Sequence, residues 1–61
     1  MTKIAIRMLG GDRDVIEAPD ECMDVVVKDG VLSVIINRYQ GPMVKRHEYP
    51  LTSIRNWEYE R

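Results

Sequence analysis

The dipeptide Asp29-Gly30, with β-forming runs on both sides, constrains this chain more than any other feature. Residues 25–28 and 31–36 are rich in Val and Ile. Asp-Gly between two such runs is the strongest short-range hairpin signal, because a type I′ turn needs positive φ at both central residues. A two-residue loop sets a register in which three pairs share one face: Met23 with Ile36, Val25 with Val34, and Val27 with Leu32. All six side chains are apolar, so we expect this face to be buried.

The same register makes two further predictions about the hairpin. One step beyond the apolar face, Glu21 would lie opposite Arg38 as a favourable cross-strand pair. The second face of the hairpin carries Val26, Val31 and Ile35. We expect this second face to be a shallower contact surface.

An apolar period close to two continues along the rest of the chain and predicts strands at residues 3–8, 15–18, 43–49 and 55–60. Turns are expected at Gly10-Gly11-Asp12, at Pro19-Asp20 and at Gln40-Gly41-Pro42. The spacing of three between Leu51 and Ile54 suits a single 3₁₀ turn before the last strand.

Meandering strands, a one-turn 3₁₀ element and a final strand together resemble the element order of SH3-like and Sm-like small barrels. We therefore expect an all-β fold: an antiparallel meander of five to six strands that closes as such a barrel or as a curled sheet. Residues 1–61 would form a single β domain. The resemblance is one of element order, and it implies no function.

The chain is too short to bury a large core. At 61 residues it hides only about 60% of its unfolded surface on folding. One Cys and one His exclude an internal disulfide and a structural zinc site. A second copy would supply further burial, so we expect a homo-oligomer, a dimer or higher, with Val26, Val31 and Ile35 at the interface.

Nothing in the sequence predicts a membrane protein or an exported one. No apolar run approaches the ~18 residues that a membrane span requires, and residues 1–7 alternate in polarity without the apolar centre of a signal peptide. We expect a cytoplasmic location and no membrane partner.

Catalytic, metal and cofactor signatures are also missing from the sequence. The motifs H-E-x-x-H, G-x-S-x-G and C-x-x-C do not occur, and His47 is the sole imidazole. Six acidic residues gather in the first half without the spacing of a calcium loop: Asp12, Asp14, Glu17, Asp20, Glu21 and Asp24. We expect no enzyme, no catalytic residue, no metal and no cofactor.

Aromatic and basic residues gather in the second half of the chain. Residues 1–30 carry 4 basic and 7 acidic groups, whereas residues 31–61 carry 5 and 3. Rings that stack on a base, interleaved with cations that meet phosphate, suit a nucleotide or a single strand of nucleic acid. The candidate ligand- or partner-binding residues are Arg38, Tyr39, Lys45, His47, Tyr49, Arg55 and Trp57. The same residue types also suit a protein interface or ordinary strand packing.

The leading functional expectation is a small non-enzymatic binding protein that acts as a homo-oligomer. It would inhibit or sequester its target, in the manner of small proteins encoded by phages and mobile elements, and the target would be a protein or a phosphate-bearing small ligand. The alternative is a barrel that binds a nucleotide signal, RNA or a single strand through the basic and aromatic C-terminal strands. A net charge of −1 disfavours nucleic acid, because phosphate neutralisation supplies most of that affinity.

Overall fold

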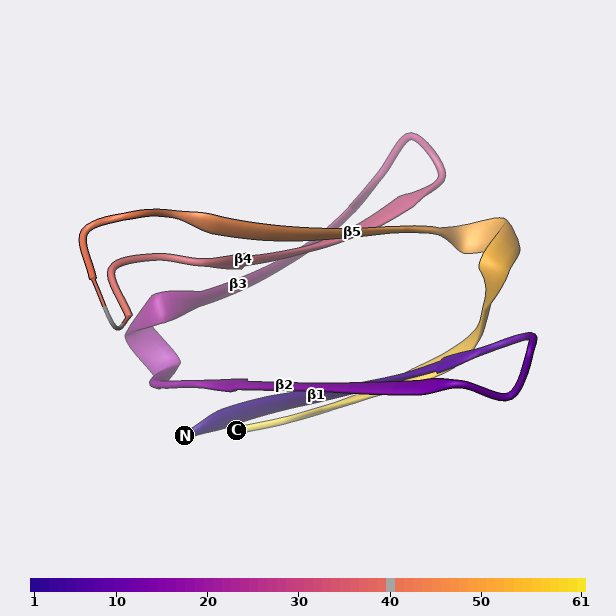
Figure 1. The fold of residues 1–61 in the computed structure, drawn as a ribbon, viewed down its shortest axis with the longest axis horizontal. Coiled ribbons are helices and arrows are strands. Elements are labelled where there is room, and N and C mark those ends of the chain that lie inside the picture. The colour runs from indigo at the N-terminus through magenta and orange to yellow at the C-terminus, as the bar shows by residue number, and fades with distance from the viewer. Residues whose placement is uncertain (40) are drawn as a thin grey trace.

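Two three-stranded antiparallel sheets make up the fold (Figure 1). The computed structural model describes residues 1–39 and 41–61. Its elements are β1 (Thr2–Met8), β2 (Arg13–Ala18), the 3₁₀ turn η1 (Asp20–Cys22), β3 (Met23–Lys28), β4 (Val31–Ile36), β5 (Lys45–Pro50), the 3₁₀ turn η2 (Leu51–Ser53) and β6 (Ile54–Glu60). Sheet A has the order β2-β1-β6 and sheet B the order β3-β4-β5. The predicted all-β class is confirmed.

The predicted hairpin and its register are confirmed. Asp29 and Gly30 have φ of 53° and 73°, as a type I′ turn requires, and the β3–β4 ladder contains all three predicted pairs. Burial of the whole face is wrong at two positions. Val25 is only partly buried, and Val27 is 51% exposed although its partner Leu32 is 0% exposed. Val27 is close to the turn on an edge strand, and the hairpin tip bends away from sheet A (Figure 1).

The expected ladder pair between Glu21 and Arg38 does not form. The β3–β4 ladder ends at Met23 opposite Ile36, and Glu21 lies in the 3₁₀ turn η1. Arg38 has left the extended region, with φ of 52°. The predicted turn at 40–42 includes Gln40, which lies outside the described residues.

The expectation of a closed barrel is wrong. Its closure would need a ladder between sheets A and B, but each crossing from one sheet to the other is made by a 3₁₀ turn that follows a proline, Pro19 or Pro50. Proline lacks the N–H that a ladder requires. Of these two turns, η2 was predicted and η1 was not. The result is two separate sheets, each with two edge strands.

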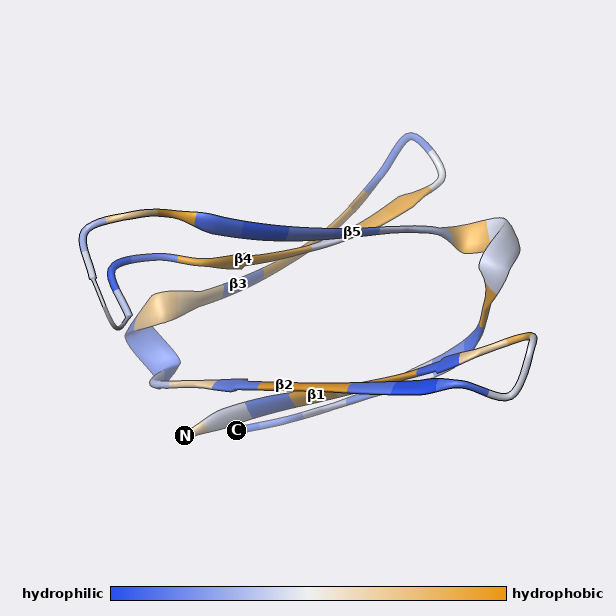
Figure 2. Ribbon diagram, in the orientation of Figure 1, coloured by the Kyte–Doolittle hydropathy of each residue, from blue (hydrophilic) through white to orange (hydrophobic). Residues whose placement is uncertain are grey.

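The core lies between the two sheets, where the inward residues of the middle strands meet. Ile4 and Ile6 of β1 and Leu32 and Val34 of β4 are each 0% exposed. The remaining core residues are Ala18, Met23, Ile36 and Ile54. Figure 2 shows apolar stretches along β1 and β4, whereas β5 is hydrophilic through most of its length.

The start of β1 is tied to η1 by a side-chain hydrogen bond. Thr2 is fully buried, and its hydroxyl donates to Asp20 Oδ1 at 2.6 Å. This bond holds the pKa of the Asp20 carboxyl below its ordinary value, because a hydrogen bond to the charged form favours ionisation. Neither short helix in residues 1–39 and 41–61 could cross a membrane.

Candidate functional site

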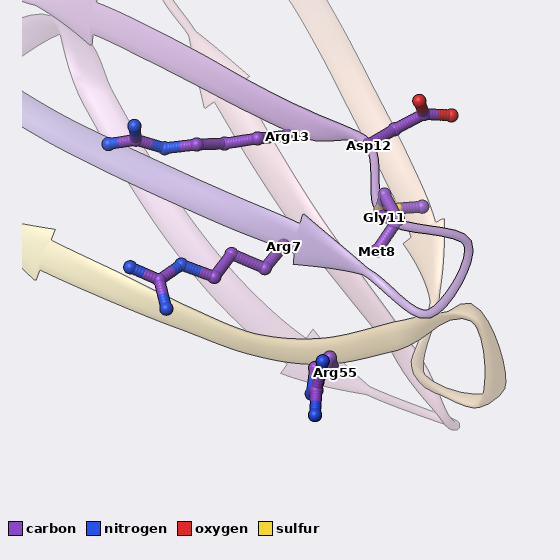
Figure 3. A pocket seen from close by; sticks show the side chains of 6 residues that line it. All are labelled: Arg7, Met8, Gly11, Asp12, Arg13 and Arg55. Carbon is purple, nitrogen blue, oxygen red and sulfur yellow. The ribbon is translucent and has the colours of Figure 1, made fainter.

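A cationic groove lies at the end of sheet A that is nearest the β1–β2 turn (Figure 3). It encloses about 190 Å³ and is open to solvent. Its lining residues are Arg7, Met8, Gly11, Asp12, Arg13 and Arg55. We call this feature the arginine groove. Three arginines and one aspartate are among its lining residues, so the lining has a net positive charge.

Two of the three arginines are direct neighbours across a ladder. Arg7 of β1 is paired with Arg13 of β2. Because Ile4 and Ile6 face the core and side chains alternate along a strand, Arg7 faces away from the core, on the outer face of sheet A. Like charges placed directly opposite destabilise a sheet, so the fold retains this pair at a cost.

Among the residues that the structure describes, one long ion pair partly neutralises these two arginines. Arg7 Nη2 lies 4.0 Å from Glu58 Oε1, with both side chains more than half exposed. Arg13 and Arg55 form no ion pair with any residue that the structure describes. In Figure 3, Arg7 and Arg13 extend side by side along the strands, and the Asp12 carboxylate points away from both.

A β-bulge in β6 places the third arginine, Arg55, at the groove. Asn56 is opposite Arg7 and Ile54 is opposite Met8, so Arg55 is an extra residue without a partner in β1. Such a bulge redirects a side chain locally. Sequence alternation alone would place Arg55 on the same side as Trp57, but Trp57 is opposite the buried Ile6, whereas Arg55 lines the groove.

The turn that separates Arg7 from Arg13 is held by backbone hydrogen bonds. Met8 N–H donates to the Asp12 carbonyl at 2.8 Å, and Gly11 N–H donates to the Met8 carbonyl at 3.1 Å. Gly11 has φ of +97°, where a residue with a side chain would be strained. Leu9 N–H also donates to the Ser53 carbonyl at 3.0 Å, which ties this turn to the residue just before β6. The three arginines are thus carried by a connected backbone.

The structure does not bring the predicted β5 and β6 residues onto one surface. Their convergence required adjacent strands, but β5 belongs to sheet B and β6 to sheet A. Lys45 and His47 are exposed on the edge strand β5. Tyr49 is half-buried, packs against the core, and donates its hydroxyl to Asp14 Oδ2 at 3.1 Å.

The remaining predicted site residues are also dispersed. Arg38 is exposed and Tyr39 is half-buried against the core, both in the segment after β4. Trp57 is 38% exposed on β6. Of the seven predicted residues, Arg55 alone lines the arginine groove.

Sequence reasoning missed Arg7 and Arg13, although a signal for them was present. Aligning Ile4 with Ile16 around the Gly10-Gly11 turn places Arg7 opposite Arg13, which is the register that β1 and β2 adopt. Composition alone does not single out this first hairpin, because the C-terminal half carries all four aromatic residues and more basic than acidic groups.

Arginine side chains arranged in this way suit an anion with several oxygen atoms. A guanidinium is charged at all physiological pH values, and its planar fork donates two parallel hydrogen bonds to a phosphate or carboxylate. Comparison of the chain with family models, with curated proteins and with solved structures finds no match in any of the three.

Proposed function

We propose that this protein is a non-enzymatic binding module that holds a phosphate-bearing ligand in the arginine groove. The observation that carries the proposal is the direct cross-strand pairing of Arg7 with Arg13, which leaves two like charges together at the rim of a groove. Arg55 adds a third cation from a bulged strand. The ligand is sequestered rather than transformed.

A bound anion would also relieve the repulsion between Arg7 and Arg13 that destabilises the free protein. A directly opposed like-charge pair costs a sheet a few tenths of a kcal/mol to about 1 kcal/mol. Hydrogen bonds to charged groups contribute about 1.5–3 kcal/mol each. A phosphate between Arg7 and Arg13 therefore gains its own contacts and also relieves their repulsion.

Calorimetry with pyrophosphate and with nucleoside triphosphates tests this proposal. Arg13→Gln should weaken binding at least about tenfold, because it removes one charged hydrogen-bond donor. Arg46→Gln is the matched control, since Arg46 is exposed on β5 in the other sheet, and it should leave the affinity within about twofold. Absence of heat with every phosphate compound, or undiminished binding by Arg13→Gln, would overturn the proposal.

A second proposal concerns self-association through the outer face of sheet B. The β3–β4–β5 register places Val26, Val31 and Ile35 on the side of the sheet opposite the buried Leu32 and Val34. Val26 is 45% exposed there, and edge strands β3 and β5 flank this face. Exposed apolar surface and open sheet edges both favour association.

Light scattering over a micromolar concentration range tests the second proposal. The wild type should give at least twice the chain mass of 7.1 kDa, and Val26→Lys with Ile35→Lys should return the monomer mass. Val44→Lys is the control, because Val44 is 58% exposed outside both sheets. A wild-type mass of one chain throughout the range would remove this proposal.

A further inference from the structure

We infer that the ligand of the arginine groove is a compact oligophosphate, such as pyrophosphate or the phosphate tail of a nucleoside di- or triphosphate, and not the backbone of a polynucleotide. This inference rests on the proposed phosphate-binding function and narrows its ligand class. It comes from how charge changes along the outer face of sheet A, beyond the groove itself.

The outer face of sheet A consists of three rows of side chains that run across its three strands. The row at the groove is Arg13, Arg7 and Asn56. The middle row is Val15, Ala5 and Glu58. The row farthest from the groove is Glu17, Lys3 and Glu60. The first row carries two positive charges, whereas the middle and last rows each have a net charge of −1.

This reversal of sign limits how far a polyanion could extend along the strands. Successive rows are about 7 Å apart, since each strand residue advances about 3.4 Å. A nucleic-acid strand whose phosphates advance at least about 3.4 Å each, the rise per strand of a duplex, would reach the row with Glu17 and Glu60 within about four nucleotides. Its phosphates would then lie within a Debye length, about 8 Å, of those carboxylates, and repulsion would oppose further contact.

Across the strands, the cationic row is short. Neighbouring strands lie about 4.8 Å apart, so the three strands of sheet A span about 10 Å. That width accommodates a short run of linked phosphate groups, and Arg55 adds a donor at the β6 side. The positive surface is therefore matched in both directions to a compact, highly charged group.

The lining residues of the groove offer no ring on which a base could stack. The groove lining contains no aromatic side chain, and the nearby Trp57 is on the core-facing side of β6, opposite Ile6. Recognition thus depends on phosphate charge, and nucleotides that differ only in the base should bind alike.

Competition binding with four probes tests the inference: tripolyphosphate, ATP, UTP and a 12-nucleotide RNA with a 5′-hydroxyl. The first three should bind within about threefold of one another, and the RNA should bind at least about tenfold more weakly at the same salt concentration. Adding a 5′-triphosphate to the same RNA should restore binding, because the end group then occupies the groove.

A double variant that removes both carboxylates of the last row, Glu17→Gln with Glu60→Gln, isolates the repulsive row. It should raise the affinity for the 5′-hydroxyl RNA at least about threefold while changing tripolyphosphate affinity less than twofold. Unchanged RNA affinity would overturn the inference, as would ATP binding without UTP binding. If the 5′-hydroxyl RNA bound as tightly as tripolyphosphate and depended on Arg13, the ligand class would be wrong but the phosphate-binding function would stand. Failure of every probe to bind would overturn the function itself.

Discussion

The Tyr49 hydroxyl donates a hydrogen bond of 3.1 Å to Asp14 Oδ2, and it joins two residues that are 35 positions apart in the chain. Tyr49 belongs to β5 at one edge of sheet B, and Asp14 belongs to β2 at one edge of sheet A. The bond therefore bridges the two sheets along one flank of the molecule, where the described strands form no ladder between them.

This bridge predicts a loss of stability at alkaline pH. Burial, followed by the hydrogen bond and charge of Asp14, raises the pKa of Tyr49 above its ordinary value of 10.0. The folded state thus holds the phenolic proton more tightly than the unfolded state, so the stabilisation is complete below pH 10 and disappears as the pH rises through the folded pKa. Urea unfolding measured at pH 8 and at pH 11 should show a larger loss of unfolding free energy for the wild type than for Tyr49→Phe. Equal losses in the two proteins would contradict the bridge.

The two members of one cross-strand pair differ in exposure, so we expect their substitution to cost different amounts of stability. Leu32 and Val27 are directly opposite in the β3–β4 ladder, yet Leu32 is 0% exposed and Val27 is 51% exposed. Leu32→Ala should cost about 2–5 kcal/mol, which approaches the whole stability of a chain this small. Val27→Ala should cost less than about 1 kcal/mol. Thermal melts followed by circular dichroism measure both, and similar losses would show that the hairpin tip is buried.

The hydrogen bond from Thr2 to Asp20 predicts an effect at acid pH. The pKa of Asp20 is lowered in the folded state, so the stabilisation is present above its ordinary value of 3.8 and is lost as the pH falls through the folded pKa. Thr2→Val should therefore be less stable than the wild type at pH 7, and the difference in unfolding free energy should narrow by pH 2.5. Thr2→Ser retains the hydroxyl and should keep the wild-type pH dependence. If the difference in unfolding free energy between the wild type and Thr2→Val did not change with pH, the hydrogen bond would not have this role.

Because Arg7 and Arg13 repel each other, we expect one substitution to raise the stability of the protein and to abolish phosphate binding. Arg13→Glu converts a like-charge pair into an opposite-charge pair, which should stabilise sheet A by roughly 0.2–1 kcal/mol. For a domain of this size the melting temperature should rise by a few degrees, while phosphate binding is lost. Arg46→Glu, on sheet B, should bring no gain in melting temperature. A lower melting temperature for Arg13→Glu would mean that the two arginines are not held in repulsion.

Local pattern determined the hairpin at the centre of the chain. Asp29-Gly30 favours a type I′ turn, and the two-residue loop sets the register in which Leu32 and Val34 are buried. The second 3₁₀ turn was predictable for the same reason, since Leu51 and Ile54 differ by three positions and Leu51 follows a proline. Such features depend on interactions between near neighbours in sequence, which a sequence displays directly.

Tertiary structure alone decided the division into two sheets and the composition of the arginine groove. Strand alternation is the same in a barrel as in two separate sheets, so it does not show that β6 pairs with β1 while β5 pairs with β4. The groove further depends on a bulge, whose one extra residue moves Arg55 out of the alternation that Trp57 follows. Arg7, Arg13 and Arg55 line one groove because β1, β2 and β6 lie side by side. Packing over the whole core decides that arrangement of strands, and no local run of residues shows it.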